Sequence, residues 1–343
     1  MKRLVWYLLA AACLCNAPRQ AGAEDKVLRV GIVGCDTSHV IAFTKLINDP
    51  QGTGPLAGVE VTVAYPGGSP DLPASRDRVA GFVAQLEKLN VNIVDSATAV
   101  ADQSDAILLT SVDGRVHREQ FRVVARGKPV FIDKPAAASL ADVLAIFRIA
   151  DATKTPCFSA SALRFSNQVT ELADDDSSGV MLACETVGPL VIEPHHPDLF
   201  WYGVHGVESL YTLMGPGCET VTRVDAEPST LVVGKWRDGR IGSFRGLKQG
   251  QPDYACTVYG SKGISQRQGF SGYGPLVERI CEFFQTGKPP VDRAESLEIF
   301  AFMEAADESK RLGGQSVAIK TVVRRAEQAT NLENAVAPAP AER

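Results

Sequence analysis

The chain has 343 residues, of which 45% are hydrophobic and 22% are charged, and its formal net charge at pH 7 is -5. This length suits two domains, and the composition is that of a globular protein. The net negative charge gives no electrostatic support to nucleic-acid binding, so we expect no nucleic-acid partner.

The first 23 residues predict a secretory signal peptide. Lys2 and Arg3 precede an apolar run over 4–14, and the small residues 21–23 supply a cleavage site. The apolar run is too short to span a bilayer comfortably, so we expect no membrane segment in the mature chain. That chain would start near Glu24 and be exported, to the periplasm or the extracellular space.

Strands and helices alternate over residues 24–155. We expect strands at 27–34, 59–65, 92–95, 106–110 and 130–133, and helices at 40–47, 76–89, 97–103, 117–126 and 140–153. The strands are near-continuous apolar runs, which is typical of strands buried on both faces. The first domain is therefore predicted to be α/β, with a Rossmann-type parallel sheet covered by helices on both faces.

The order of the predicted elements changes after Pro156, where several strands follow one another with few helices between them. Strands are expected at 180–187, 220–226, 230–236, 240–245 and 254–259, and helices at 205–214, 276–285 and 294–312. This order predicts an α+β domain over 156–330, built on an open antiparallel sheet. The Ala- and Pro-rich tail at 331–343 is expected to be disordered.

One predicted strand ends in Asp133, Lys134 and Pro135. Ligands of open α/β sheets bind beyond the carboxyl ends of the strands. An ammonium group at such a strand end is well placed for proton transfer. Lys134 is therefore the first catalytic candidate.

With this order of elements, the run from His117 to Pro135 resembles the Gfo/Idh/MocA superfamily, which includes glucose-fructose oxidoreductase and inositol dehydrogenases. In that family a Rossmann domain binds NAD or NADP, and an open antiparallel sheet shapes a sugar or polyol pocket and commonly pairs between subunits. The resemblance implies an NAD(P)-dependent oxidoreductase acting on a sugar or polyol hydroxyl, with a homo-oligomer formed through the second sheet. The family's Glu-Lys-Pro maps onto Asp133, Lys134 and Pro135, which implies a catalytic, substrate-binding Lys134 with Asp133 beside it.

A second match follows at Gly203, His205 and Glu208, which resemble the family's Asp-x-Gly-x-His-x-x-Asp. The resemblance implies that His205 lines the substrate pocket and shares the acid/base chemistry with Lys134, and that Glu208 contacts substrate. Trp201 stands where the leading aspartate belongs, which removes one proton-relay carboxylate and offers an aromatic surface to a sugar ring. The candidates for substrate binding are Asp133, His195, Trp201, Tyr202 and Glu208.

The nucleotide-binding loop departs from the fingerprint GxGxxG. The loop reads Gly34-Cys-Asp36-Thr37-Ser38-His39, which keeps only the first glycine. Asp36 would place a carboxylate near the diphosphate, and the repulsion would cost a few kcal/mol even at an effective dielectric constant of about 20. The expected cofactor contacts are Gly34, Asp36, Thr37, Ser38 and His39, with Ser111, Asp113 and His117 after the fourth strand.

The sequence is compatible with more than one cofactor and with more than one role for this loop. The second strand ends in Tyr65 and Pro66 without an acid for the ribose, whereas Ser69 or Arg76 would suit the 2′-phosphate of NADP. Asp36 and His39 are either an N-cap and a packing residue, or part of a substrate site. In the second case we expect both to face Lys134 across the crevice.

Two other functions compete with the oxidoreductase. One is an exported, non-redox carbohydrate-binding or regulatory protein, which the degenerate glycine loop favours. The other is a metal-assisted lyase or hydrolase that uses Glu193, His195, His196 and Asp198. Adjacent histidines diverge on an extended segment, so we expect no bound metal.

Overall fold

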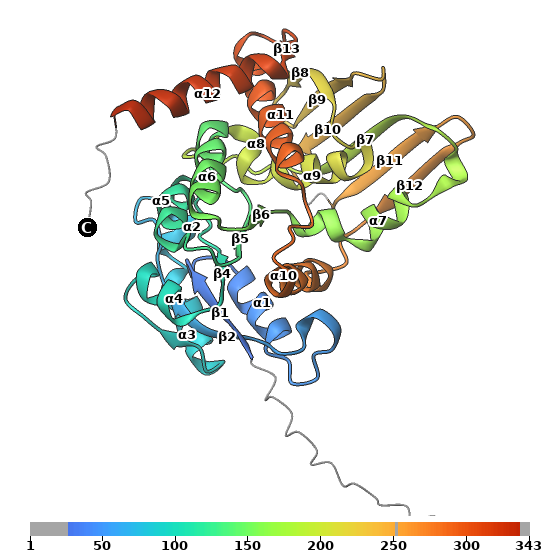
Figure 1. The fold of residues 1–343 in the computed structure, drawn as a ribbon. Helices are drawn as coiled ribbons and strands as arrows, with labels where there is room; N and C mark the ends of the chain where they lie inside the picture. Colours follow the sequence, from blue (N-terminus) through green and yellow to red (C-terminus); the bar gives the residue numbers. More distant parts are fainter. Residues whose placement is uncertain (1–26, 251–252, 337–343) are drawn as a thin grey trace, which may run out of the picture.

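The computed structural model describes residues 27–250 and 253–336, and the predicted signal peptide lies outside them. The chain forms two lobes: the lower one in Figure 1, blue to green, holds the first sheet, and the upper one holds the second. Across the described ranges, no helix combines the length and apolarity that crossing a membrane requires.

The first sheet is parallel throughout, as predicted. Its six strands have the order β3-β2-β1-β4-β5-β6. They are β1 (Leu28–Val33), β2 (Val59–Tyr65), β3 (Asn92–Ile93), β4 (Ala106–Leu109), β5 (Val130–Ile132) and β6 (Cys157–Ser159). The strand order reverses between β1 and β4, and ligands of open α/β sheets bind at such a switch point.

Helices cover both faces of this sheet. On β4, Ala106 and Leu108 face one hydrophobic cluster while Ile107 and Leu109 face the other, as alternation along a strand requires. The helices are α1 (His39–Ile47), α2 (Pro73–Arg76), α3 (Val79–Lys88), α4 (Ala97–Gln103), α5 (Gly114–Val124) and α6 (Leu140–Thr153). The helix expected at 76–89 is α3, which begins at Val79 and is preceded by the short α2, and the one expected at 117–126 begins three residues earlier.

The first lobe extends beyond residue 155. β6 pairs with β5 as the sixth parallel strand, and α10 (Gly274–Thr286) packs against the same face as α1. Figure 1 shows α10 in the lower lobe next to α1. Phe158 of β6 and Phe283 of α10 meet edge to face at 5.0 Å between ring centroids. A late segment of the chain therefore completes the core of the first domain.

The second sheet is antiparallel except where β10 runs parallel to β7. Its order is β12-β11-β7-β10-β9-β8-β13. The strands are β7 (Met181–Pro189), β8 (Cys218–Asp225), β9 (Ser229–Trp236), β10 (Ile241–Leu247), β11 (Ala255–Gly260), β12 (Ile264–Gln268) and β13 (Val317–Ala318). The fold class predicted from the sequence is confirmed.

The remaining helices pack along the second sheet and the lobe boundary. They are α7 (Asn167–Ala173), α8 (Asp198–Trp201), α9 (Gly203–Met214), α11 (Arg293–Arg311) and α12 (Ile319–Val336). Helix α12 was not predicted from the sequence, although its residues Val322 and Ala326 are buried. It also passes the expected start of the disordered tail at residue 331, and residues 337–343 lie outside the described part.

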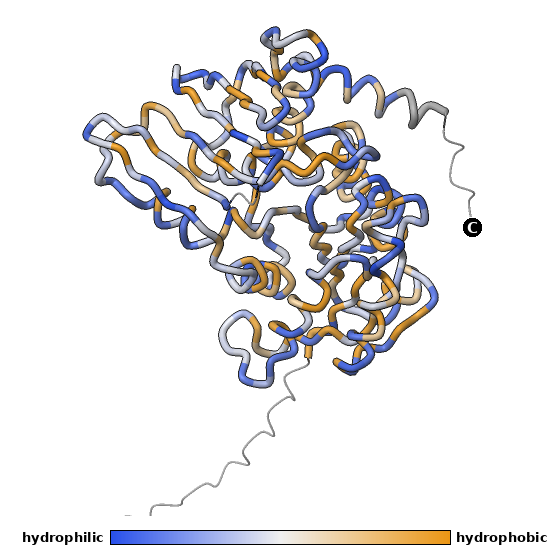
Figure 2. Tube along the Cα trace, turned by 180° about the vertical axis from the view of Figure 1, so that it is seen from behind, coloured by the Kyte–Doolittle hydropathy of each residue, from blue (hydrophilic) through white to orange (hydrophobic). Residues whose placement is uncertain are grey.

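Hydrophobic residues follow the strands and helices inside both lobes, and hydrophilic residues mark most of the turns (Figure 2). The six cysteines of the described ranges, at 35, 157, 184, 218, 256 and 281, are buried and unpaired. Burial raises the pKa of Cys35 to about 12, so its thiol is inert at neutral pH. Hydrophobic packing therefore stabilises the two lobes, without disulfides between these six cysteines.

Replacement of Phe283 by alanine tests whether α10 belongs to the core of the first lobe. We expect F283A to lower the free energy of unfolding by about 3–5 kcal/mol, because a buried aromatic side chain is lost and a cavity remains. The matched control is F270A, at a phenylalanine that is 38% exposed, and we expect it to cost far less. Urea denaturation measures both, and equal losses would contradict the packing described.

Candidate active site

A cavity of about 390 Å³ opens beyond the carboxyl ends of the parallel strands, between the two lobes. Both lobes contribute to its wall. The lining residues are Thr37, Ser38, His39, Ala74, Arg78, Val112, Lys134, Ala162, Leu163, Trp201, Tyr202, His205, Tyr254, Phe270 and Tyr273. Seven of the residues singled out in the sequence are among them: Thr37, Ser38, His39, Lys134, Trp201, Tyr202 and His205.

Lys134 follows β5 and enters the cavity from the first lobe. The Lys134–Pro135 peptide bond is cis. The Nζ atom lies 5.4 Å from the centroid of the Tyr202 ring, which contributes a cation–π contact. Burial, reinforced by the charge of Arg78, lowers the pKa of Lys134, while Asp133 opposes that shift. The amine therefore gives up a proton more easily than an exposed lysine does.

His205 lies in the first turn of α9, on the opposite wall. Its Nδ1 is 2.7 Å from the hydroxyl oxygen of Ser161, which also accepts a hydrogen bond from the backbone N–H of Leu163. Burial, together with the nearby charges of Lys134 and His39, holds the pKa of His205 well below its usual value. At neutral pH its imidazole is uncharged and available to accept a proton.

His39 and Asp133 form a close pair at the floor of the site. His39 Nδ1 lies 2.6 Å from Asp133 Oδ2, and Asp133 Oδ1 accepts a hydrogen bond of 2.8 Å from the backbone N–H of Lys134. The His39 ring stacks on Phe43 at 5.2 Å and meets Tyr273 edge-on at 4.8 Å. The sequence had placed His39 among cofactor contacts, and the structure adds its partner.

Asp36 does not face Lys134, contrary to the substrate-site hypothesis. Its Oδ1 accepts from the backbone N–H of Val112 at 2.8 Å, and its Oδ2 accepts from the hydroxyl of Ser75 at 2.6 Å. Burial raises the pKa of this carboxyl group, while those hydrogen bonds lower it. Asp36 therefore ties three loops of the first lobe together. Both of its carboxylate oxygens are hydrogen-bonded and it does not line the cavity, which weakens the expected repulsion of a diphosphate.

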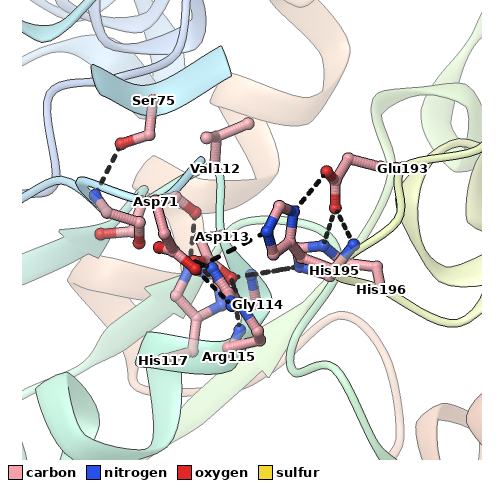
Figure 3. A network of polar contacts seen from close by, with 12 residues as sticks. Asp71, Ser75, Val112, Asp113, Gly114, Arg115, His117, Glu193, His195 and His196 are labelled. Carbon is pink, nitrogen blue, oxygen red and sulfur yellow. Dashed lines mark hydrogen bonds and ion pairs between the residues drawn. The ribbon is translucent and has the colours of Figure 1, made fainter. Parts of the chain in front are cut away.

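A second polar network joins the lobes beside the cavity (Figure 3). The carboxylate of Glu193 lies 2.8 Å from His195 Nδ1 and 2.9 Å from His196 Nδ1. His196 Nε2 accepts from the backbone N–H of Gly114 at 3.1 Å and is 3.2 Å from Asp113 Oδ1. Both histidines thus contact the same carboxylate. On an extended segment their side chains would point in opposite directions, but residues 193–196 form a turn.

Arg115 extends that network across the first lobe. Its guanidinium bonds Asp113 at 2.8 Å and Asp71 at 2.9 Å, which joins the loop after β2 to the start of α5. Burial alone would raise the pKa of Asp113, but the neighbouring His196 ring and the hydrogen bonds from Arg115 hold it well below its usual value. Asp113 is therefore an ionised structural bridge, and it does not line the cavity.

Several other predicted contacts also lie away from the cavity. Glu208 is buried and bonds Arg164 Nε at 2.6 Å, so its carboxylate is held inside the second lobe. The hydroxyl of Ser111 bonds Gln120, and both ring nitrogens of His117 lie near backbone carbonyls, including that of Ser111. Gly34, His195 and Asp133 do not line the cavity either, although Asp133 contacts two residues that do.

The four residues considered for a metal site do not form one ligand set. Asp198 bonds Arg223 at 2.8 Å and Lys310 at 2.6 Å, away from the two histidines. Within 27–250 and 253–336 there is no group of three or more His, Cys, Asp or Glu side chains arranged to hold a metal ion.

Sequence reasoning missed the aromatic wall and one cation of the site. Tyr254 precedes β11 in the second lobe, Phe270 and Tyr273 lie between β12 and α10, and Arg78 precedes α3. Neither motif nor spacing connects them in the sequence. Only tertiary packing brings them to the cavity that Lys134 lines.

The cavity wall fits the nicotinamide end of a dinucleotide better than the adenosine end. Thr37 and Ser38 stand at the N-terminus of α1, where backbone N–H groups favour anions. Lys134 and His205 lie within the same cavity. On the adenosine side, however, Asp36 and Arg115 join the loops that follow β1, β2 and β4. A full dinucleotide requires these loops to separate or to be bypassed.

Comparison with solved structures identifies many chains of this fold. A probable dehydrogenase from Thermotoga maritima aligns with a TM-score of 0.71 and 18% identity, over 86% of this chain and 100% of that one. Myo-inositol dehydrogenase from Lactobacillus casei, in complex with NAD(H) and myo-inositol, aligns with a TM-score of 0.68 and 16% identity, over 85% of this chain and 96% of that one. Scyllo-inositol dehydrogenase from the same organism, with NAD(H) and scyllo-inositol, aligns with a TM-score of 0.69 and 12% identity, over 86% of this chain and 100% of that one.

No protein-family model and no curated protein sequence matches the chain. At identities of 12–18%, the structural likeness establishes the fold. The fold implied by the Gfo/Idh/MocA resemblance is thereby confirmed, and the chemistry is argued from the site.

Substitution of Asp36 tests its role as a bridge between loops. We expect D36A to lower the free energy of unfolding by about 1–3 kcal/mol, because the buried N–H of Val112 loses its acceptor. D36N keeps an acceptor oxygen at this position and should cost less. Thermal denaturation of both variants measures the difference. Equal, negligible effects would contradict the bridging role.

Proposed function

We propose that the protein is an NAD(P)-dependent oxidoreductase that acts on a sugar or polyol hydroxyl. The observation that carries this proposal is the convergence of Lys134 and His205 on one cavity beyond the parallel strands, in a fold that inositol dehydrogenases share. A lysine whose pKa is lowered and a histidine that is neutral suit the removal of a hydroxyl proton.

Lys134 and His205 have separate tasks in this proposal. The Nζ of Lys134 donates a hydrogen bond to the oxygen of the reacting hydroxyl. The Nδ1–H of His205 donates to the Ser161 hydroxyl oxygen, which leaves Nε2 as the acceptor for the proton. A nicotinamide held beside these residues would supply the acceptor for the hydride that leaves the adjacent carbon. Trp201, Tyr202 and Tyr254 supply apolar surfaces that orient the substrate ring.

Thr37 and Ser38, at the start of α1, would hold the cofactor next to Lys134. If the chain is exported, as its first 23 residues predict, it meets this cofactor where nicotinamide nucleotides are scarce. A cofactor that stays bound during purification would reconcile export with redox chemistry.

An exported, non-redox carbohydrate-binding or regulatory protein is the second candidate. The hydrogen bonds of Asp36 and the ion pairs of Arg115 favour it, since they join loops that a dinucleotide would separate. The cavity itself would still accept a small polyol.

Release of bound material from the native protein distinguishes the two candidates. The protein purified from its own compartment is denatured, and the supernatant is examined by mass spectrometry and absorbance. NAD or NADP at near-equal stoichiometry supports the oxidoreductase. A released sugar without nicotinamide, and no NAD(H) binding by calorimetry, supports the second candidate.

Substitution of the acid/base residues tests the chemistry. We expect K134M and H205Q to lower kcat/KM for the best polyol of a panel by about 10²–10⁴-fold, because K134M removes the hydrogen-bond donor to the reacting oxygen and H205Q removes the proton acceptor. In the wild type, activity should persist well below pH 6.5, since the pKa of His205 is lowered, and should fall on the alkaline side before pH 10.5, since the pKa of Lys134 is lowered.

The matched control is K128M, at a lysine that bonds the backbone carbonyl oxygens of Ala101 and Ser104 outside the cavity. It should keep wild-type kcat/KM. Rates for K134M that equal those of the wild type would overturn the assignment.

A further inference from the structure

We propose that His39 is a second acid/base residue of this cavity and that Asp133 is its positioning residue. Specifically, the proton that leaves the substrate hydroxyl ends on Nε2 of His39 before it passes to water. The inference rests on the proposed oxidoreductase function and adds a residue that occupies the third-glycine position of the nucleotide fingerprint.

The geometry fixes which nitrogen of His39 is free. Nδ1 lies 2.6 Å from Asp133 Oδ2, and the ring is held between Phe43 and Tyr273. The ring therefore has little freedom to turn its nitrogens. His39 lines the cavity together with Lys134 and His205, with 11% of its side chain exposed. Nε2 is the nitrogen left for a ligand or water.

The ionised state of Asp133 determines which group of the pair donates the hydrogen bond. Burial would raise the pKa of Asp133, but His39 and Lys134 hold it below its usual value, so the carboxyl group is ionised. An ionised carboxylate only accepts hydrogen bonds, so Nδ1 of His39 carries the proton. A carboxylate on Nδ1–H fixes the tautomer and stabilises the imidazolium that forms when Nε2 takes a proton.

His39 is better suited than His205 to hold a proton. Positive charge on His205 is opposed by burial and by Lys134 and His39. Across the reaction, the substrate C–H bond gives its hydride to the nicotinamide and the O–H bond gives its proton to the protein. His205 passes that proton on, and His39 holds it against Asp133. His39 thereby replaces the relay carboxylate that is lost at Trp201.

The polar groups that contact His39 or line the cavity with it come from every wall of the site. They are Asp133 and Lys134 after β5, His205 of α9, Tyr273 before α10, Arg78 before α3 and Thr37 before α1. The single anionic partner among them at neutral pH is Asp133. Loss of this carboxylate should therefore change the hydrogen bonding of the His39 ring more than loss of any other group named here.

The first test needs no turnover. Histidine labelled with ¹⁵N is incorporated, and long-range ¹H–¹⁵N spectra of the full chain are recorded across pH, with His39 assigned by loss of its signals in H39Q. We expect the Nδ1–H tautomer in the wild type. D133N should weaken that tautomer preference. An Nε2–H tautomer in the wild type, or a tautomer preference that D133N leaves unchanged, would overturn the pairing.

The second test measures catalysis in wild type, H39Q, D133N and the double variant, with NAD and the best substrate of a polyol panel. We expect H39Q to lower kcat/KM by about 10²–10⁴-fold with NAD affinity unchanged. D133N should lower kcat/KM as well, and the double variant should resemble H39Q because the pair acts as one unit. K128M, at a lysine outside the cavity, is the control.

The outcomes separate the inference from the proposed function. If the wild type reduces no nicotinamide with any polyol, the proposed function fails, and the catalytic role of His39 fails with it, while the spectra still decide the pairing. If the wild type is active and H39Q matches it in kcat/KM and pH profile, His39 is a packing residue and only the inference fails.

Discussion

The carboxylate of Asp133 is the interaction on which the site depends. It is buried at the end of β5, where one oxygen contacts His39 and the other accepts from the backbone of Lys134. A buried charge is costly unless it is paired and hydrogen-bonded. Here the pairing fixes the start of α1 against the end of β5. The same contact thus sets the position of His39, the path of the chain into Lys134 and the floor of the cavity.

A second set of charged and polar side chains fixes the position of one lobe against the other. Glu193 and His196 reach from the second lobe to Gly114 and Asp113 at the start of α5 (Figure 3). Since Trp201 packs its ring at 4.9 Å from that of His196, the network also supports the aromatic wall of the cavity. The residues suspected of binding metal therefore position the residues that line the site.

Local patterns predicted the elements that carry strong periodicity or a good cap. Helix α6 has the bounds expected for it, because the Ser139 side chain caps the helix by accepting from the backbone N–H of Asp142. The three-residue strand β6 and the polar edge strand β12 carry no such pattern, and both were missed. The start of α5 was placed late because the cap at Asp113 was overlooked.

The candidate site was predicted where a residue follows a strand or begins a helix, as Lys134, His39 and His205 do. It was predicted poorly where a partner decides the role. Asp36 and Glu208 have the chemistry expected of site residues, yet Ser75 and Arg164 hold them elsewhere. Tyr254 and Tyr273 join the site only through tertiary packing, which no sequence spacing records.

Isotope transfer tests the central claim, hydride chemistry at Lys134, most directly. Wild-type protein and K134M are incubated with NAD and a polyol deuterated on carbon, such as labelled myo-inositol, and the nicotinamide is analysed by mass spectrometry. The account predicts deuterium in the reduced nicotinamide ring with the wild type and little with K134M. Consumption of the polyol without label in the nicotinamide would contradict it.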